Sequence, residues 1–191
     1  MCAFITLADE HFLAKGNDRL VYQYPDDDAL IIKVVIPSIP KYRSKVREMR
    51  LEIKACTAKS LEDQKYIQTI KGYVETNLGL GEIVRKETDQ NGDIAPTLYD
   101  LALAGELNKE KLDQLNVLLS WFMTTNVIIN SLHCKNIVYT FSDGKYRFKI
   151  IDGFGDKTFF QMSKFSRYIL ARSKTKCLTR LFRQLVELSE R

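Results

Sequence analysis

Short hydrophobic runs separated by polar turns occupy the first half of the chain and predict β-strands. Turn-rich segments at Tyr24–Asp28 and Gln90–Asp93 each separate two apolar runs, which is a hairpin signal. One helix, over 44–64, is expected between the strands because that stretch combines spaced apolar residues with good helix formers. The expected strands are 12–24 (one strand, or two around Lys15–Asp18), 29–36, 66–73 and 75–87.

The second half of the chain has mainly helical patterns. A short helix is expected to start at Thr97, a residue type that caps helices. A long helix is expected from Asn108 to about Thr125, with leucines recurring on one face. A hairpin with its turn at Ser142–Lys145 follows, and the remainder is predicted to be helical. The order of elements indicates an α+β chain with two unequal halves.

Composition places the chain among ordinary globular proteins. Its 191 residues suit one compact domain or two small lobes that share a core, and 45% of them are hydrophobic. The apolar runs are too short to cross a bilayer, and the N-terminus lacks a signal-peptide pattern, so we expect a cytoplasmic protein. The four cysteines are far apart and form no Cys-x-x-Cys, which argues against zinc.

The net charge of +5 favours an anionic partner: a nucleotide, a nucleic acid or a phosphorylated sugar. Basic residues concentrate after Lys157, where only Glu187 and Glu190 oppose them. Such a helical tail is usually a solvated face, and the alternatives are an anionic lipid surface, a phosphorylated substrate or a partner. Specific nucleic-acid binding is not expected, because no RNA- or DNA-binding motif is present.

Four groups of residues together supply what phosphoryl transfer from ATP needs: a cover over the phosphates, a lysine for the α and β phosphates, an acid that orients the lysine, and two oxygen ligands for Mg²⁺. They are a turn with Gly16 and Asn17, Lys33 in an apolar strand, Glu48 and Glu52 on the following helix, and Asn136 and Asp152 on either side of the late hairpin. A buried lysine needs an acidic partner, and amide and carboxylate oxygens suit Mg²⁺. Each group alone has an ordinary structural explanation. Their order predicts a crevice in which Lys33 meets two oxygen ligands for the metal.

Several segments together carry a resemblance to a known family. They are Gly16–Tyr22, Ile31–Val34, Leu51–Lys54, Gly72–Gly81, Thr97–Leu98, Ser131–Ile137 and Ile151–Gly155. These segments resemble the YrbL-type (PhoP regulatory network protein) family of the protein-kinase-like superfamily, over about residues 8–185. The resemblance implies a bilobal α+β fold. Its N-terminal lobe, 1–86, has an antiparallel sheet and one helix, and its reduced, mostly helical C-terminal lobe is 87–191.

The resemblance also implies roles for individual residues. Gly16 and Asn17 would cover the phosphates, and Lys33 would contact the α and β phosphates. Glu52 is favoured over Glu48 to orient Lys33, because Leu51–Lys54 is a matching segment. The backbone near Val84 would contact adenine. The implied ligands are ATP and Mg²⁺, with Asn136 and Asp152 as the metal ligands.

The kinase pattern departs at the catalytic base. The aspartate expected five residues before the catalytic-loop asparagine is Ser131, and a neutral hydroxyl is no base near pH 7. Loss of a general base typically costs about 10²–10⁴ in rate. His133 is the best stand-in by residue type, and the alternative is a loop histidine bonded to backbone. Little room for an activation loop separates Asp152 from a helix predicted near Ser163, which favours a small or carbohydrate acceptor over a protein.

Three functions therefore stay open. The first is an ATP- and Mg²⁺-dependent phosphotransferase that uses Lys33, Glu52, Ser131 and His133. The second is a pseudokinase, a regulatory or binding protein without turnover, because Ser131 replaces the aspartate. The third is a nucleic-acid or membrane-surface binder that acts through the basic tail.

Overall fold

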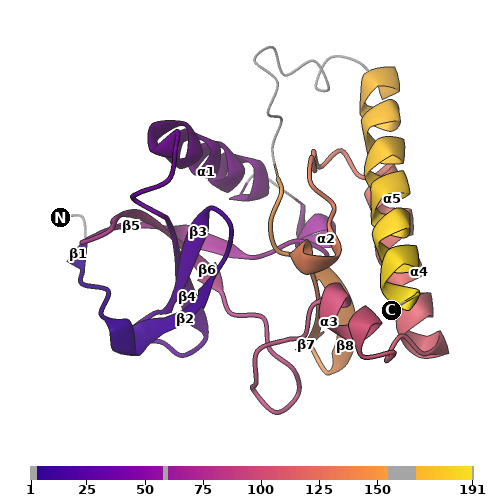
Figure 1. Ribbon diagram of the computed structural model, residues 1–191, viewed down its shortest axis with the longest axis horizontal. Helices are drawn as coiled ribbons and strands as arrows, with labels where there is room; N and C mark the ends of the chain where they lie inside the picture. The colour runs from indigo at the N-terminus through magenta and orange to yellow at the C-terminus, as the bar shows by residue number, and fades with distance from the viewer. Residues whose placement is uncertain (1–3, 58–59, 155–166, 191) are drawn as a thin grey trace. The chain divides into compact units, whose positions relative to one another are not determined.

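The computed structural model describes residues 4–57, 60–154 and 167–190 (Figure 1). The chain forms two compact units, the first made of Met1–Ala58 and Thr69–Lys86, the second of Lys59–Gln68 and Glu87–Arg191. The sequence-based division also fell at residue 86, but it assigned 59–68 to the N-terminal lobe. The structure groups that segment with the second unit.

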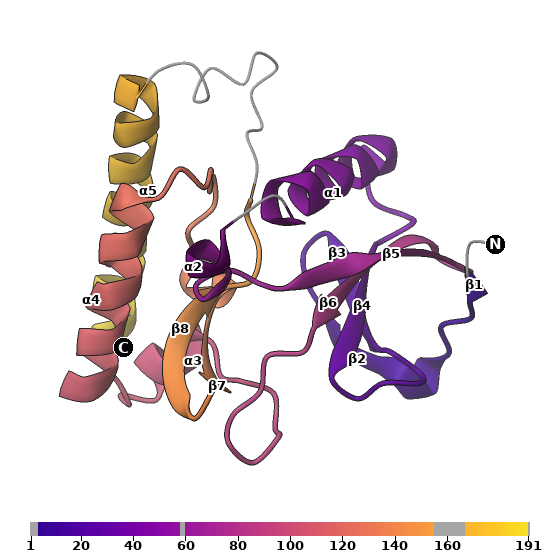
Figure 2. The same cartoon turned by 180° about the vertical axis from the view of Figure 1, so that it is seen from behind.

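A six-stranded sheet forms the centre of the first unit, in the order β1-β5-β6-β4-β3-β2 (Figure 2). Its neighbouring strands are antiparallel except β1, which pairs with β5 in parallel. The predicted hairpin at Tyr24–Asp28 joins β3 to β4. The strands are β1 Phe4–Ile5, β2 Phe12–Lys15, β3 Arg19–Gln23, β4 Leu30–Val35, β5 Ile70–Thr76 and β6 Gly79–Arg85.

Two expectations about this unit were wrong in detail. The turn between β5 and β6 lies at Asn77 and Leu78, not at residue 74, because the Thr76 hydroxyl donates to the Gly79 carbonyl and accepts from the Leu78 amide. The helix predicted over 44–64 is two helices, α1 (Tyr42–Thr57) and α2 (Leu61–Gln64). A new N-cap explains the second start, because the Ser60 side chain accepts from the Asp63 amide.

The two faces of the sheet have separate cores. Leu7, Tyr22, Ile32, Val34 and Val74 pack together on one face. On the other face Val35 and Leu80 pack with Met49 of α1. Side chains alternate between faces along a strand. Lys33, between Ile32 and Val34, therefore lies on the face that α1 covers.

The part of the second unit that the structure describes is mostly helical, with one β-hairpin. Both predicted helix starts are confirmed, because Thr97 forms a capping box with Asp100 and the Asn108 side chain accepts from the Lys111 amide. The second predicted turn, Gln90–Asp93, is closed by hydrogen bonds from the Asp89 amide to the Asp93 carbonyl and from the Ala95 amide to the Glu87 carbonyl, and Thr88 and Ile94 pair as an isolated bridge. The elements are α3 Leu98–Leu103, α4 Lys109–Thr124, the 3₁₀ turn η2 Cys134–Asn136, β7 Ile137–Ser142, β8 Lys145–Ile150 and α5 Arg167–Ser189.

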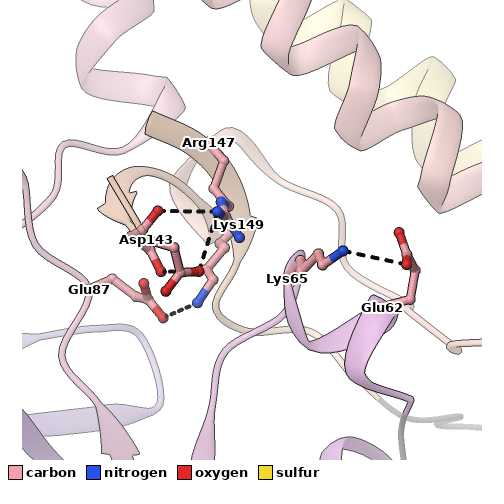
Figure 3. A network of polar contacts seen from close by, with 7 residues as sticks. Glu62, Lys65, Glu87, Asp143, Arg147 and Lys149 are labelled. Carbon is pink, nitrogen blue, oxygen red and sulfur yellow. Dashed lines mark hydrogen bonds and ion pairs between the residues drawn. The ribbon is translucent and has the colours of Figure 1, made fainter. Parts of the chain in front are cut away.

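Strand β8 carries two buried cations that have acidic partners (Figure 3). Lys149 Nζ lies 3.0 Å from Glu87 Oε1, with the two side chains 4% and 8% exposed. Arg147 Nη2 contacts the carboxylate of Asp143, in the hairpin turn, at 3.4 Å. A buried ion pair of this kind fixes the segment that starts at Glu87 onto the hairpin. None of the described helices has both the length and the apolarity needed to span a membrane.

Candidate functional site

The predicted phosphate-covering turn joins β2 to β3. Its backbone closes on itself, because the Gly16 amide donates to the Arg19 carbonyl at 2.8 Å. Gly16 and Asn17 are both exposed. A Cβ at Gly16 would meet the Arg19 carbonyl at 3.5 Å, which is ordinary contact, so the fold does not demand glycine there.

Contacts with β4 and α1 hold this turn in place. The Asp18 carbonyl accepts from the Ile36 amide at 3.0 Å, and the Asp18 carboxylate lies 2.7 Å from Lys45 Nζ of α1. Glu48 also bonds Lys45, at 3.2 Å. The hydrogen bond that Lys45 donates to Asp18, supported by Glu48, raises the pKa of Lys45 from its usual 10.5. Glu48 is thus a partner of Lys45, whereas the side chain of Glu52, the favoured partner of Lys33, lies outside the described residues.

Lys33 is buried, with 6% exposure, in the middle of β4. The strand register places it directly opposite Glu82 of β6 and Val21 of β3. Glu82 is fully buried, and its Oε2 lies 3.3 Å from Arg19 Nη1. Val84, two residues beyond Glu82, is on the same face and only 1% exposed. Sequence reasoning placed Glu82 in the hinge for adenine by its backbone alone and missed its side chain, although a single charge inside the apolar stretch Leu80–Val84 was a usable signal.

Asn136 and Asp152 are side by side at the open end of the β7–β8 hairpin. The Asn136 carbonyl accepts from the amide of Ile151, the residue before Asp152, at 2.9 Å. Asn136 Nδ2 donates to the Ser131 carbonyl at 3.1 Å, so that its amide group is oriented by the backbone at Ser131. Asp152 Oδ1 accepts from the Gly153 amide at 2.6 Å. The structure therefore brings together the two residues predicted as metal ligands.

Gly153 ties the Ser131 loop to the segment that carries Asp152. Its carbonyl accepts from the Asn130 amide at 2.8 Å. Its φ is +88°, and a Cβ at this position would lie 2.5 Å from the Ser131 carbonyl oxygen. A bridge between Ile129 and Phe154 continues the contact. Only glycine fits this approach, so Ser131, Asn136 and Asp152 are held in one local arrangement.

His133 contacts helix α5 and not the backbone. Its Nδ1 is hydrogen bonded to Gln184 Nε2, and Gln184 Oε1 accepts from the Cys134 amide at 3.1 Å. With the amide oxygen already bonded to Cys134, the Gln184 amide nitrogen donates to the ring, and the neutral imidazole carries its proton on Nε2. An Nε2–H group is a donor. This arrangement favours a positioning role for His133 over that of a base.

The cysteines and the basic tail match their ordinary structural interpretations where they are described. Cys134 and Cys177 are buried free thiols, and burial raises the pKa of Cys134 to about 11. On α5 the basic side chains Arg172, Lys176, Arg180 and Arg183 are exposed. Lys174 is buried instead: it donates to the carbonyls of Met123 and Thr125, and burial lowers its pKa. Contact of the exposed residues with an anionic surface stays a prediction.

No cluster of three or more His, Cys, Asp and Glu side chains that would hold a metal ion occurs among the described residues. The stretch between Asp152 and the helix expected near Ser163, which is predicted to leave little room for an activation loop, lies mostly outside them, because the structure does not describe 155–166. The donors that the structure brings together for Mg²⁺ are thus the Asn136 amide and the Asp152 carboxylate.

The comparisons with known proteins define first the class and then the family. The fold is that of a protein kinase: a crystal structure described as a kinase domain matches with a TM-score of 0.52 and 16% identity, over 80% of this chain. The match covers 54% of that kinase domain, so this chain spans about half its length. The chain belongs to the family described as PhoP regulatory network protein YrbL, whose model matches residues 5–186. No curated protein sequence matches the chain.

Proposed function

We propose that this kinase-like protein binds ATP with Mg²⁺. The observation that carries the proposal is the pairing of Asn136 and Asp152 at the end of the β7–β8 hairpin, with Ser131 bonded to both segments. Lys33, buried on the α1-covered face of the sheet, supports it. The second unit would supply the metal ligands. The first unit would supply Lys33 for the α and β phosphates, the Gly16–Asn17 turn to cover them, and the backbone near Val84 for adenine.

The donor set fits a hard cation. Asn136 directs its amide nitrogen to the Ser131 carbonyl and therefore presents Oδ1 as the ligand atom. A carboxylate oxygen of Asp152 completes a two-residue set, and phosphate oxygens and water normally fill the remaining positions around Mg²⁺. Bound Mg²⁺ would neutralise the charge of the phosphate groups.

Phosphoryl transfer to a small or carbohydrate acceptor is the activity that such a site supports. Lys33, with Glu52 as its partner, and the metal would supply positioning and electrostatic stabilisation. The second candidate is a pseudokinase that binds nucleotide as a regulatory signal. Two observations favour it: Ser131 is at the position of the base, and Gln184 donates to His133 Nδ1.

Calorimetric titration with ATP and Mg²⁺ tests the proposal. We expect millimolar ATP to raise the thermal unfolding midpoint. A ligand concentration one hundred times Kd adds about 2.7 kcal/mol to the free energy of unfolding. Asp152→Asn should abolish the part of ATP binding and of thermal stabilisation that depends on Mg²⁺. Asp113→Asn, at an exposed position on α4, is the matched control and should bind as the wild type does. A folded wild-type sample that gives no heat and no thermal shift would rule out the nucleotide site.

Turnover separates the two candidates. In Ser131→Asp a carboxylate returns to the position of the base. If the remaining groups are placed for transfer, phosphate release from ATP should rise by about 10²–10⁴. A Ser131→Asp variant that binds ATP and Mg²⁺ without any rise in phosphate release would favour the pseudokinase. Ser131→Asn, of the same size but neutral, is its control.

A further inference from the structure

Two adjacent stripes of side chains line the exposed side of helix α5 in the second unit (Figure 1). A helix has about 3.6 residues per turn, so side chains three and four residues apart are neighbours on its surface. The basic stripe repeats at this spacing and consists of Arg172, Lys176, Arg180 and Arg183, all exposed. The second stripe, called here the apolar stripe, runs beside it and consists of Tyr168, Ala171, Thr175, Thr179, Phe182 and Val186, all exposed as well.

The opposite side of α5 packs into the second unit. Cys177 and Leu181, about half a helix turn away from the stripes, are buried. The large side chains of the apolar stripe are instead left in water, because Tyr168, Phe182 and Val186 are 76%, 49% and 55% exposed. The helix therefore has a second, uncovered face in addition to the one that its own unit buries.

The basic stripe has no charge compensation within the helix. The sequence contains no acidic residue between Tyr168 and Val186, and the first one, Glu187, follows the end of both stripes. Among the described residues, none forms a hydrogen bond or an ion pair with any of the four basic side chains. Like charges four residues apart repel, so the pairs at 172/176 and 176/180 destabilise the helix. An anionic surface outside the chain would offset that repulsion.

The two threonines of the apolar stripe have their hydroxyl groups bonded to the helix itself. Thr175 Oγ1 donates to the Ala171 carbonyl at 3.1 Å, and Thr179 Oγ1 donates to the Thr175 carbonyl at 3.0 Å. A polar group that keeps its hydrogen bond costs less to remove from water than one that loses it. The middle of the apolar stripe can therefore leave water with little loss of hydrogen bonding, as its large side chains can at both ends.

We propose that this face of α5 binds the surface of an anionic lipid membrane. The basic stripe would contact the headgroups, and the apolar stripe would lie at the boundary between headgroups and acyl chains. Cations beside apolar side chains along one helix are typical of helices that lie on a membrane surface. Tyr168 suits this depth, because its ring is apolar and its hydroxyl group is polar.

Two other occupants match this face less well. A nucleic acid would contact the basic stripe, but its phosphates gain nothing from an exposed aliphatic side chain such as Val186. A second copy of α5 would bring two basic stripes together, and like charges that face each other across an interface repel. The charge of the face thus favours an anionic partner, and the apolar stripe favours lipid over nucleic acid.

Vesicle flotation of the 191-residue chain tests the proposal. Vesicles of phosphatidylcholine with phosphatidylglycerol are compared with vesicles of phosphatidylcholine alone. We expect tighter binding to the anionic vesicles, and weaker binding as the salt concentration rises. The double variant Lys176→Gln with Arg180→Gln should weaken this binding about 25-fold, since each cation near an anionic surface contributes about fivefold.

A second double variant tests the apolar stripe, and a third is the control. Phe182→Ser with Val186→Ser keeps every charge and should weaken binding to anionic vesicles about tenfold, because less apolar surface leaves water. Arg43→Gln with Arg47→Gln removes the same charge from exposed positions on α1 and should bind as the wild type does. Thermal unfolding midpoints show that each variant is folded.

Several outcomes would overturn the proposal. The first is a wild type that does not float with anionic vesicles at low salt. The second is an equal loss in the α1 control, because net charge and not the α5 face would then determine binding. Tight binding to a DNA duplex that the Phe182→Ser, Val186→Ser variant retains would indicate a nucleic-acid surface instead. A dimer that sedimentation detects and that this variant loses would assign the face to a second copy. None of these measurements involves ATP, so the proposed function stands or falls separately.

Discussion

Single residues with unusual backbone geometry hold the candidate metal site together. Gly153 combines φ of +88° with a position where a Cβ would meet the Ser131 carbonyl. Gly144, in the β7–β8 turn, has a similar φ of +76° but no atom within 4 Å of the same position. These two glycines therefore differ in crowding, while both require a left-handed conformation.

Gly153→Ala and Gly144→Ala form a matched pair for stability. We expect Gly144→Ala to lower the free energy of unfolding by about 1–2 kcal/mol, because alanine is disfavoured in the left-handed backbone conformation. Gly153→Ala should cost about 1–3 kcal/mol more, because the methyl group must displace the Ser131 loop. Urea unfolding measures both. Equal losses in the two variants would contradict the close approach of Gly153 to Ser131.

Sequence patterns identified functional candidates that belong to one local motif. They missed residues whose partners come from distant parts of the chain. The spacing from Ser131 to Asn136 and Asp152 located three neighbours correctly within the second unit. Gln184 is 51 residues from His133, and no local pattern connects them. Glu82 becomes significant only through its register with Lys33, since strand pairing cannot be read from one isolated charge.

Helix α1 stabilises the turn between β2 and β3 through the Lys45–Asp18 pair. The folded-state pKa of Lys45 is raised above 10.5, first by the hydrogen bond to Asp18. The stabilisation from this pair is therefore fully present below the unfolded pKa and is lost as the pH rises through the folded pKa. Asp18 is 46% exposed, so screening by water keeps the contribution within about 1 kcal/mol.

Lys45→Met tests the pair by its pH dependence. The variant should be less stable than the wild type by up to about 1 kcal/mol at pH 8, and the difference should disappear above the raised pKa. Chemical unfolding at pH 8 and at increasing pH through the alkaline range gives the comparison. Lys71→Met, at an exposed position on β5, should show no such pH-dependent difference. A difference that persists unchanged at high pH would count against the ion pair.

Whole elements were predictable where a local chemical signal marks their ends. Thr97 and Asn108 cap α3 and α4 at the positions expected from their residue types. The β5–β6 turn was misplaced because its signal is a hydroxyl, Thr76, whose hydrogen bonds form only when the turn closes. The single predicted helix over 44–64 is two, since its run of good helix formers masked the cap at Ser60.

At the scale of the whole molecule, the chain leaves the first unit and returns to it. Residues 59–68 follow α1 and precede β5, yet they belong to the second unit. Asp63 binds them there: its Oδ1 accepts from Trp121 Nε1 at 3.0 Å and from the Thr125 hydroxyl at 2.7 Å. Tyr66 stacks on the Trp121 ring with a centroid separation of 4.9 Å. A linear reading of the sequence divides such a chain once and therefore misassigns the segment.

Trp121 is the single tryptophan of the chain, so fluorescence excited selectively at tryptophan reports on the second unit. Asp63→Ala removes the acceptor of the indole and of Thr125. We expect the fluorescence-detected unfolding midpoint in urea to fall, with a loss of about 1.5–3 kcal/mol for hydrogen bonds to a charged group. Asp113→Ala, on the exposed side of α4, should leave the midpoint within about 0.5 kcal/mol. If both variants unfold at the wild-type midpoint, the 59–68 segment is not held through Asp63, and its place in the second unit depends on the apolar contacts of Tyr66 and Ile67 instead.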